Sequence, residues 1–326
     1  MKIMTVTKPF TWIPGIGPDA EVLARMEDFF PKPTEPMGEA WFMGEKRKMF
    51  TALCKKRLSQ ISTKYLQDCL TEIAGTSAFG PRAEWDSWYH YLLPRLIPRC
   101  FENYLGEYLV EYLITALITV YPVNILERYM GFREDVLCTL GQVIMDPSLW
   151  NREEIIVGKM LHRAWPEYAE RPGWGWHKAS GDFSAMMFLC WKYLDAGQID
   201  RWLQSVFAIR STHWQAQLLV WLLGSRSVSR GEVTQPAQFD KVQPEIDWAY
   251  SHTLDGHYDG NYQSPTIHPF LSAENLKAFR KALQRYLTPD MFLQWVEAIE
   301  KYPYLKEELC TLPDQFMAAF FSEESV

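Results

Sequence analysis

The segment SHTLDGHYDGNYQSPTIH, residues 251–268, concentrates residue types that bind metal ions. Its middle alternates side chains in the manner of a calcium-binding loop: Asp255, His257, Asp259 and Asn261. In such a loop the twelfth position is a glutamate that binds calcium through both of its oxygens. Here that position is Thr266, and His257 is a poor ligand for calcium, so the pattern does not favour this ion.

Zinc or another transition metal suits the same segment better, because imidazole and carboxylate groups together bind such ions. The candidate ligands are His252, Asp255, His257, Asp259 and His268. Their spacing matches no established zinc motif. The alternative interpretation is a polar, glycine-rich surface loop whose side chains hydrogen-bond nearby backbone groups. A metal ion bound in this segment would indicate a metal-dependent hydrolase.

A second candidate metal site joins two pairs of residues, each separated by four positions: Asp86 with His90, and Glu107 with Glu111. This spacing places both members of a pair on one face of a helix. The two helices are expected over about 85–93 and 104–121. If these faces turned toward one another, they would resemble the metal sites of helix bundles, although the Glu-x-x-His signature of di-iron proteins is absent.

Ion pairs offer the alternative explanation for the two glutamates, because a buried carboxylate needs a partner. The candidate partners are Arg95, Arg99 and Arg128. The sequence shows no G-x-S-x-G motif, no P-loop and no cysteine in an activating setting. We therefore expect no cofactor, and the residue patterns favour a protein that is not an enzyme.

Aromatic side chains supply a second kind of candidate site. The chain has 14 Trp, 16 Tyr and 18 Phe residues, and most of these rings are expected to fill layers between helices. Exposed aromatic residues in loops are typical anchors of protein–protein contacts. The binding residues that we expect are Trp174, Trp176, His177, His252, His257, Tyr258 and Tyr262. The two tryptophans could instead pack beneath neighbouring helices.

Charge and cysteine usage limit the classes of partner. The net charge of −7 argues against general nucleic-acid binding and suits a basic protein partner. The six cysteines are scattered without a C-x-x-C pair, which is typical of a reducing compartment. The first residues contain no long apolar run of the kind found in signal peptides. We therefore expect a cytoplasmic protein.

The helix around which the chain is organised is expected at 104–121, with the sequence YLGEYLVEYLITALITVY. Its apolar residues point in almost every direction around the axis, so other helices must cover it on most sides. Pro122 ends it, because a proline displaces the preceding residue from the helical conformation. Glu107 and Glu111 leave too short an apolar stretch for a membrane span.

Helical periodicity recurs along the chain, and no stretch shows convincing alternation with a period of two. The expected helices cover about 20–30, 45–58, 62–74, 84–100 with an interruption at its two prolines, 104–121, 124–144, 147–165, 182–195, 198–209, 212–223, 272–287, 289–301 and 313–321. The predicted fold class is all-α, with ten or more antiparallel helices. They would form an irregular bundle or a stack of helix pairs of the HEAT or armadillo kind.

The expected organisation has four parts. Residues 1–44 form an irregular arm with one helix, and residues 45–224 form the main helical domain. Residues 225–270 are a long loop excursion in which only Glu245–Ser251 is expected to be helical. Residues 271–326 supply C-terminal helices that pack on the main domain. This organisation favours a non-enzymatic protein that binds another protein, as a scaffold, an adaptor or an inhibitor of the immunity type.

Overall fold

The protein is built almost entirely from helices. The computed structural model describes residues 9–43, 45–75, 80–101, 109–161, 178–248, 250–254 and 269–321. Within these ranges, named strands occur only in two short antiparallel hairpins. The prediction of an all-α protein with many helices is therefore confirmed.

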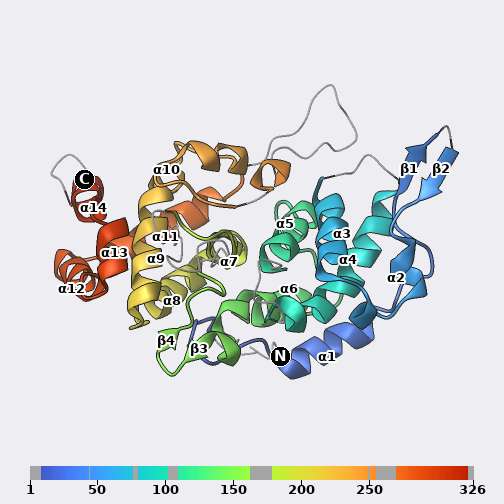
Figure 1. The fold of residues 1–326 in the computed structure, drawn as a ribbon, viewed down its shortest axis with the longest axis horizontal. Coiled ribbons are helices and arrows are strands. Elements are labelled where there is room, and N and C mark those ends of the chain that lie inside the picture. Colours follow the sequence, from blue (N-terminus) through green and yellow to red (C-terminus); the bar gives the residue numbers. More distant parts are fainter. Residues whose placement is uncertain are drawn as a thin grey trace, which may run out of the picture.

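The helices form two groups that lie next to each other along the longest axis of the molecule (Figure 1). The first group contains α1 (Ala20–Phe29), α2 (Thr51–Lys55), α3 (Thr63–Gly75), α4 (Arg82–Leu96), α5 (Val110–Val120) and α6 (Phe132–Thr139), with 3-10 helices at Leu58–Gln60, Ile97–Phe101 and Leu140–Met145. The second group contains α7 (Gly181–Tyr193), α8 (Ala196–Phe207), α9 (Thr212–Gly224), α10 (Arg226–Arg230), α11 (Ala273–Tyr286), α12 (Pro289–Ile299), α13 (Pro303–Glu308) and α14 (Leu312–Phe320). Buried apolar residues of both groups form one continuous core.

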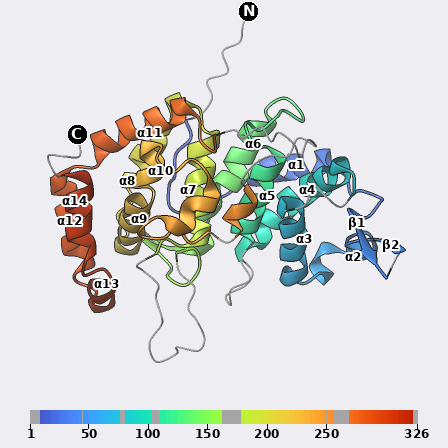
Figure 2. The same cartoon turned by 90° about the horizontal axis from the view of Figure 1, so that it is seen from above.

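Helix α5 lies where the two groups meet, between α3 and α7, as the views in Figures 1 and 2 agree. Its residues Leu113, Ile114, Ala116 and Leu117 point in different directions and are all buried. The predicted central position of this helix is therefore confirmed for the described residues of α5. The first part of the expected helix, residues 104–108, lies outside them.

Helices α7 and α9 form the core of the second group. Every residue of α7 is buried, so neighbours cover this helix on all sides. The rings of Phe188 and Trp191 on α7 pack against Trp221 on α9 and Phe279 on α11, with the Trp191 and Phe279 centroids 3.9 Å apart. The expectation that aromatic residues fill layers between helices holds for this cluster.

The interruption expected at the two prolines falls at the end of helix α4. The α-helix continues through Pro94 and changes to a 3-10 helix at Ile97, so the expected interruption comes after the first proline. Arg95 extends from this turn to the end of α1, where its guanidinium donates to the carbonyls of Glu27 at 2.7 Å and Phe30 at 3.2 Å. These bonds satisfy carbonyls that have no partner at a helix C-terminus, and they fix α1 against α4.

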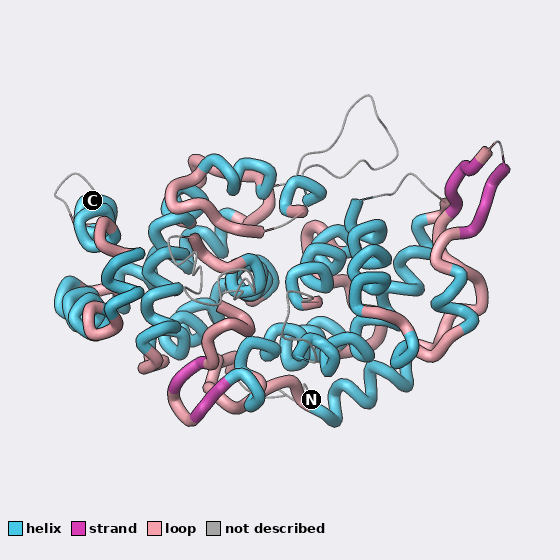
Figure 3. The backbone as a smooth tube through the Cα atoms, in the orientation of Figure 1, coloured by secondary structure: helices cyan, strands magenta, loops and turns pink. Residues whose placement is uncertain are grey.

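Two short hairpins stand out in Figure 3. Their strands are β1 (Glu39–Phe42) with β2 (Glu45–Lys48), and β3 (Trp150–Asn151) with β4 (Glu154–Ile155). The helix predicted at 45–58 is therefore wrong in its first part, and only α2 remains of it. Phe50 adopts a left-handed conformation with φ of 49°, which an α-helix does not allow. Lys48 instead pairs with Glu84 of α4 at 3.0 Å.

The helix predicted at 124–144 begins later than expected. Gly131, with φ of 93°, is the N-cap of α6, so the preceding residues form a loop. The helix predicted from Pro147 is also wrong over its described part. Asp146 caps the first turn as expected, but this turn is a three-residue 3-10 helix, and the chain then enters the β3–β4 hairpin with Arg152 at φ of 59°.

The segment 225–270 covers the core over much of its described length. It contains α10 and two 3-10 helices, at Pro236–Lys241 and Ser251–Leu254. The described residues of the helix expected at Glu245–Ser251 are not α-helical, and only Ser251 belongs to a helix, the second of these 3-10 helices. Phe239 and Trp248 are buried, and their rings lie 4.8 and 5.8 Å from the ring of Phe188 on α7. Aromatic packing therefore ties these described residues to the second helix group.

Helices α11, α12 and α14 follow the predicted boundaries closely, whereas α13 was not predicted. Ser272 and Thr288 cap α11 and α12 as expected, because their hydroxyl oxygens accept the amides of Asn275 at 3.1 Å and Met291 at 3.2 Å. Helices α12 and α14 pack against α9. None of the helices in the described ranges has the length and apolar character needed to cross a bilayer.

Candidate functional site

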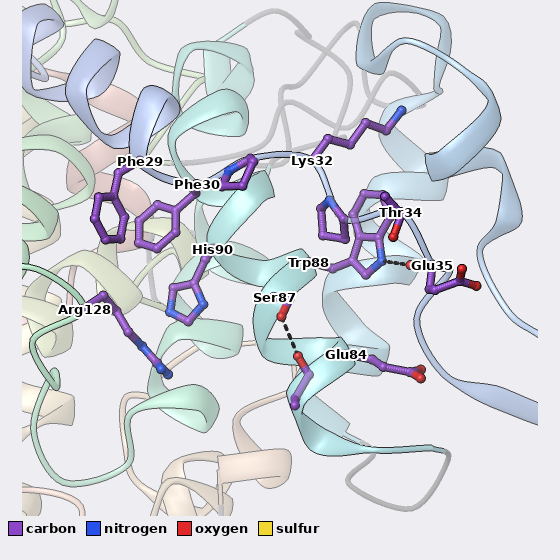
Figure 4. A pocket seen from close by; sticks show the side chains of 13 residues that line it. Phe29, Phe30, Lys32, Thr34, Glu35, Glu84, Ser87, Trp88, His90 and Arg128 are labelled. Carbon is purple, nitrogen blue, oxygen red and sulfur yellow. Dashed lines mark hydrogen bonds between the residues drawn. The ribbon is translucent and has the colours of Figure 1, made fainter.

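A cleft of about 680 Å³ opens in the first helix group, between the end of α1 and helix α4 (Figure 4). After α1 the chain runs along this cleft over Pro31–Glu35 without regular secondary structure. Arg128, from the loop between α5 and α6, also lines it. We call this site the α1–α4 cleft. Its volume lies within the range of sites that enclose small ligands or the side chains of a partner.

Aromatic rings form the apolar part of the α1–α4 cleft. Phe29 and Phe30 come from the end of α1, and Trp88 and His90 come from α4. The Phe30 ring stacks on the His90 imidazole with centroids 5.0 Å apart. Trp88 Nε1 donates to the carbonyl of Glu35 at 2.8 Å, which holds the segment after α1 against α4. The apolar wall is therefore fixed by stacking and by a hydrogen bond.

A chain of hydrogen bonds joins Arg128, Tyr121 and His90 inside the cleft. Arg128 Nε donates to the Tyr121 hydroxyl at 2.8 Å, and this hydroxyl lies 2.5 Å from His90 Nε2. Because the hydroxyl oxygen accepts from arginine, its own proton is directed to His90, and Nε2 is the unprotonated nitrogen. Burial, with the Arg128 charge, lowers the pKa of His90 to about 4, and burial raises the pKa of Tyr121 to about 12. Both groups are neutral at pH 7.

This arrangement separates the described members of the second candidate metal site. His90 is engaged by Tyr121 and by the backbone of Asp86, while the Asp86 carboxylate accepts from Arg82 Nε at 2.9 Å. Among the residues that the structure describes, no three His, Cys, Asp or Glu side chains are grouped so that they could hold a metal ion. Glu107, the fourth member, lies outside the described residues.

The buried Glu111 lies at the junction of α5 and α7. Its Oε2 is so close to the start of α7 that a Cβ atom added to Gly181 would lie 2.1 Å away. Asp182 of α7 in turn accepts the amide of Glu111 at 3.2 Å. Each helix therefore places a carboxylate at the N-terminus of the other, where the helix dipole favours negative charge. Of the arginines expected to pair with Glu111, Arg95 and Arg128 donate to the other acceptors named above.

The loop of residues 122–131, which joins α5 to α6, is fixed from both ends. Arg128, in the second half of the loop, bonds back to Tyr121, the residue that precedes the loop, as described above. At its end, Glu127 Oε2 accepts the amides of Gly131 at 2.9 Å and Phe132 at 2.8 Å. These amides begin α6 and have no acceptor within the helix. The glutamate therefore caps α6 and holds the 122–131 loop in one conformation.

A third contact places the 122–131 loop against α1. The Tyr129 hydroxyl donates to Asp135 of α6 at 2.6 Å. Arg25 of α1 donates to the same carboxylate from two nitrogens, at 3.0 and 2.5 Å. The Tyr129 ring then lies 4.5 Å from the ring of Phe29, measured between centroids. The loop therefore adjoins the α1–α4 cleft.

The 122–131 loop exposes apolar side chains beside this cleft. The exposed fractions are 98% for Met130, 65% for Leu126 and 50% for Val123, and Phe29 is 47% exposed. We call these four residues the apolar loop surface. Single exposed apolar residues are normal on a protein surface. Here, however, four of the ten large apolar residues that are exposed in the described ranges occur on one loop and the adjoining helix end.

Charges around the cleft include three exposed carboxylates. Asp28 precedes Phe29, Glu35 lines the cleft, and Glu127 precedes Arg128. Among the lining cations, the Lys32 ammonium donates to two backbone carbonyls near the end of α2, at 3.1 and 3.2 Å. Exposed acidic residues therefore line the cleft or directly precede residues that line it.

Most of the sequence-predicted site residues lie outside the described residues: Trp174, Trp176, His177, Asp255, His257, Tyr258, Asp259, Tyr262 and His268. Their roles in binding or in metal coordination stay predictions. His252 is described and exposed, three residues before the part of its segment that lies outside the described residues. Its ring lies 6.1 Å from Tyr250, and the Tyr250 ring lies 5.5 Å from Tyr112 of α5.

Sequence reasoning missed the apolar loop surface. Leu126 and Met130 fall within the helix predicted at 124–144, and Val123 directly precedes it; their spacing of three and four residues is that of one helix face. The useful signal was the pair of residues that bracket them. Pro122 and Gly131 both interrupt helices, and between them the apolar residues belong to a loop.

Comparison with known protein families, with curated proteins and with solved structures yields no match for this chain.

Proposed function

We propose that this chain is a non-enzymatic binding protein that holds another protein through the α1–α4 cleft and the adjoining apolar loop surface. The observation that supports this most directly is the exposure of Met130, Leu126 and Phe29 beside a cleft lined by aromatic rings. Aromatic residues, methionine and arginine are enriched in protein–protein contacts. An open pocket next to exposed apolar residues fits an anchor side chain of a partner.

Preorganisation supports the same proposal. Partners that order loops on binding lose affinity, because the lost conformational freedom opposes association. The 122–131 loop is already held by the side chains of Glu127, Arg128 and Tyr129. Its apolar residues are therefore presented in a fixed position before a partner arrives.

The partner that fits this surface carries an apolar anchor next to lysine or arginine side chains. The anchor would enter the cleft between Phe29 and Trp88. The basic groups would face the exposed carboxylates of Asp28, Glu35 and Glu127. The overall charge of −7 favours the approach of a basic partner. The scattered cysteines, without a C-x-x-C pair, are typical of a reducing compartment, and we infer that this interaction takes place in the cytoplasm.

The test begins with a photo-crosslinking residue at position 130. Proteins captured from an extract of the native host are identified, and the purified partner is titrated by calorimetry. We expect the double substitution Leu126→Ser with Met130→Ser to weaken binding at least tenfold, because loss of an interface anchor typically costs more than about 1 kcal/mol.

The matched control is Leu293→Ser with Met317→Ser, which removes two exposed apolar side chains from α12 and α14. This variant should bind as the unmodified protein does. Equal binding by both double variants, or crosslinking at position 317 and not at position 130, would place the contact elsewhere on the chain.

A further inference from the structure

Lys192 is a lysine buried in the second helix group, and it does not line the α1–α4 cleft. It occupies the last turn of α7, and 7% of its surface is exposed. It lines a cavity of about 560 Å³ whose walls come from the end of α7, the first turns of α8 and α11, Arg133 of α6, and Val123 and Asn124 of the 122–131 loop. A primary amine in such a cavity is both enclosed and within reach of a small molecule.

The Lys192 amine has no carboxylate within ion-pair distance among the described residues. Its Nζ donates to the carbonyl of Phe270 at 2.5 Å and lies 4.9 Å from the centre of the Phe270 ring. Desolvation by burial lowers the pKa of Lys192 to about 8. At neutral pH the uncharged amine is then roughly 300-fold more populated than for an exposed lysine.

Backbone amides at the start of α11 contribute to the same cavity. Ser272 caps this helix through a neutral hydroxyl, which accepts the amide of Asn275 at 3.1 Å. The preceding amides, of Ala273 and Glu274, have no acceptor within the helix. The N-terminus of a helix favours anionic groups for this reason. The buried amine and the helix N-terminus therefore complement different groups of one ligand.

Asn275 fixes these two features relative to one another. Its Nδ2, which carries two hydrogens, lies within hydrogen-bond distance of three carbonyls, those of Trp191 at 2.8 Å, Lys192 at 3.1 Å and Leu194 at 3.0 Å. Nε1 of Trp191 donates to the carbonyl of Asn275 at 3.2 Å. The start of α11 is therefore fastened to the end of α7, and the distance between the amine and the helix N-terminus is set by buried hydrogen bonds.

Three other charged side chains line the cavity. Arg133 donates to Asp195 at 2.8 Å and to the carbonyl of Tyr193 at 2.6 Å, so this arginine and this aspartate offset one another. Glu274 is exposed in the first turn of α11. Lys192 thus contributes the buried positive charge at the inner side of the cavity.

We propose that Lys192 is a reactive amine that forms an imine with an aldehyde or ketone bearing a carboxylate or phosphate group. The nitrogen of the neutral amine attacks the carbonyl carbon to give a carbinolamine, which loses water to leave a C=N bond. The step consumes one carbonyl compound, releases one water and needs no oxidant or reductant. The anionic group of the ligand would lie at the start of α11. The alternative is that Lys192 only tethers Phe270 to the end of α7.

The experiment uses pyridoxal 5′-phosphate as the probe, because it carries both an aldehyde and a phosphate. The folded protein is incubated with the probe, the imine is trapped with borohydride, and the labelled lysines are quantified by peptide mass spectrometry. We expect Lys192 to be labelled saturably and at least tenfold faster than Lys281, an exposed lysine of α11. Pyridoxal, which lacks the phosphate, should lose most of this preference.

A variant separates the role of the helix N-terminus from that of the amine. Ser272→Asp keeps a good N-cap residue and adds a negative charge at the cavity. In this variant Lys192 should react with pyridoxal 5′-phosphate and with pyridoxal at similar rates. Labelling of Lys192 that is no faster than that of Lys281, or that occurs only after denaturation, would show a purely structural lysine and overturn the proposal. Equal rates for the two probes on the unmodified protein would overturn the anionic part of the ligand class.

Discussion

Gly181 is the first residue of α7 and lies against the side chain of Glu111 from α5. A side chain at this position would collide with its neighbours. A methyl group there would lie 2.1 Å from Oε2 of Glu111 and 2.6 Å from the carbonyl oxygen of Asp247. We expect Gly181→Ala to lower the free energy of unfolding by roughly 1–3 kcal/mol or more, because overpacking shifts buried groups. Denaturant unfolding measures this change.

The control is Gly197→Ala in α8, where nothing lies within 4 Å of the added atom. Alanine is the better helix former, so this variant should be as stable as the parent or slightly more stable. If both alanine variants had the same stability, the close approach of Glu111 to α7 would be contradicted.

The contribution of His90 to the free energy of unfolding depends on pH. Its pKa is about 4 in the folded protein and near 6.5 when unfolded. Between these values the unfolded chain binds more protons, so protonation favours unfolding. The contribution is complete above about pH 6.5 and falls as the pH is lowered toward 4. By pH 4.5 the loss should be about 2.5 kcal/mol.

The measurement compares unfolding free energies of the parent and His90→Gln at pH 7.5 and pH 4.5. Glutamine does not titrate in this range, and its side-chain oxygen can accept from Tyr121. Carboxylates elsewhere contribute equally to both proteins and cancel in the difference. A parent and variant that lose the same stability on acidification would mean that His90 is protonated as easily in the folded state as in the unfolded one.

At the scale of elements, the 122–131 loop and α6 are joined by Glu127. Glu127→Ala removes the acceptor for the amides of Gly131 and Phe132. The loss of a cap costs about 1 kcal/mol of stability, and the loop should also become less ordered. We expect weaker binding of the partner in calorimetry, together with faster amide exchange in the loop. Glu134→Ala, an exposed residue in the first turn of α6, is the control and should change neither quantity.

The sequence predicted those helices whose first residues follow a capping side chain. Helix α12 begins at Pro289 after the Thr288 cap, and α11 begins after Ser272, so local chemistry sets these boundaries. The β1–β2 hairpin depends on a distant partner, because Lys48 pairs with Glu84 of α4. Local patterns do not contain such contacts.

The candidate site was harder to predict for the same reason. Phe29, Trp88 and Arg128 belong to three different elements and meet only after the chain folds. The residues expected from composition to bind a partner were aromatic loop residues such as Trp174, which lie outside the described part of the chain. What the sequence did indicate correctly is the amount of ring packing in the core.

At the scale of the whole molecule, two helix groups share one core through α5 and α7. The aromatic cluster around Phe188 belongs to the second group, and the stacked pair of Phe30 and His90 belongs to the first. Between them α5 carries buried apolar residues on most sides. The α1–α4 cleft lies in the first group, whereas the Lys192 cavity lies between the second group and the start of the 122–131 loop, so Val123 belongs both to the wall of that cavity and to the apolar loop surface.

The charge of the whole molecule governs how a basic partner approaches. With a net charge of −7, long-range attraction should speed the encounter, and salt screens this attraction over about 10 Å at 0.1 M. We expect the association rate constant to fall several-fold when ionic strength rises from about 0.05 to 0.5 M, while the dissociation rate changes little. Stopped-flow kinetics with the purified partner measures both rates. Leu126→Ser with Met130→Ser should show the opposite behaviour, with faster dissociation and the same dependence on salt, because it removes contact area and leaves the charge intact. An association rate that is independent of salt would contradict a basic partner and would leave the apolar contact to carry recognition alone.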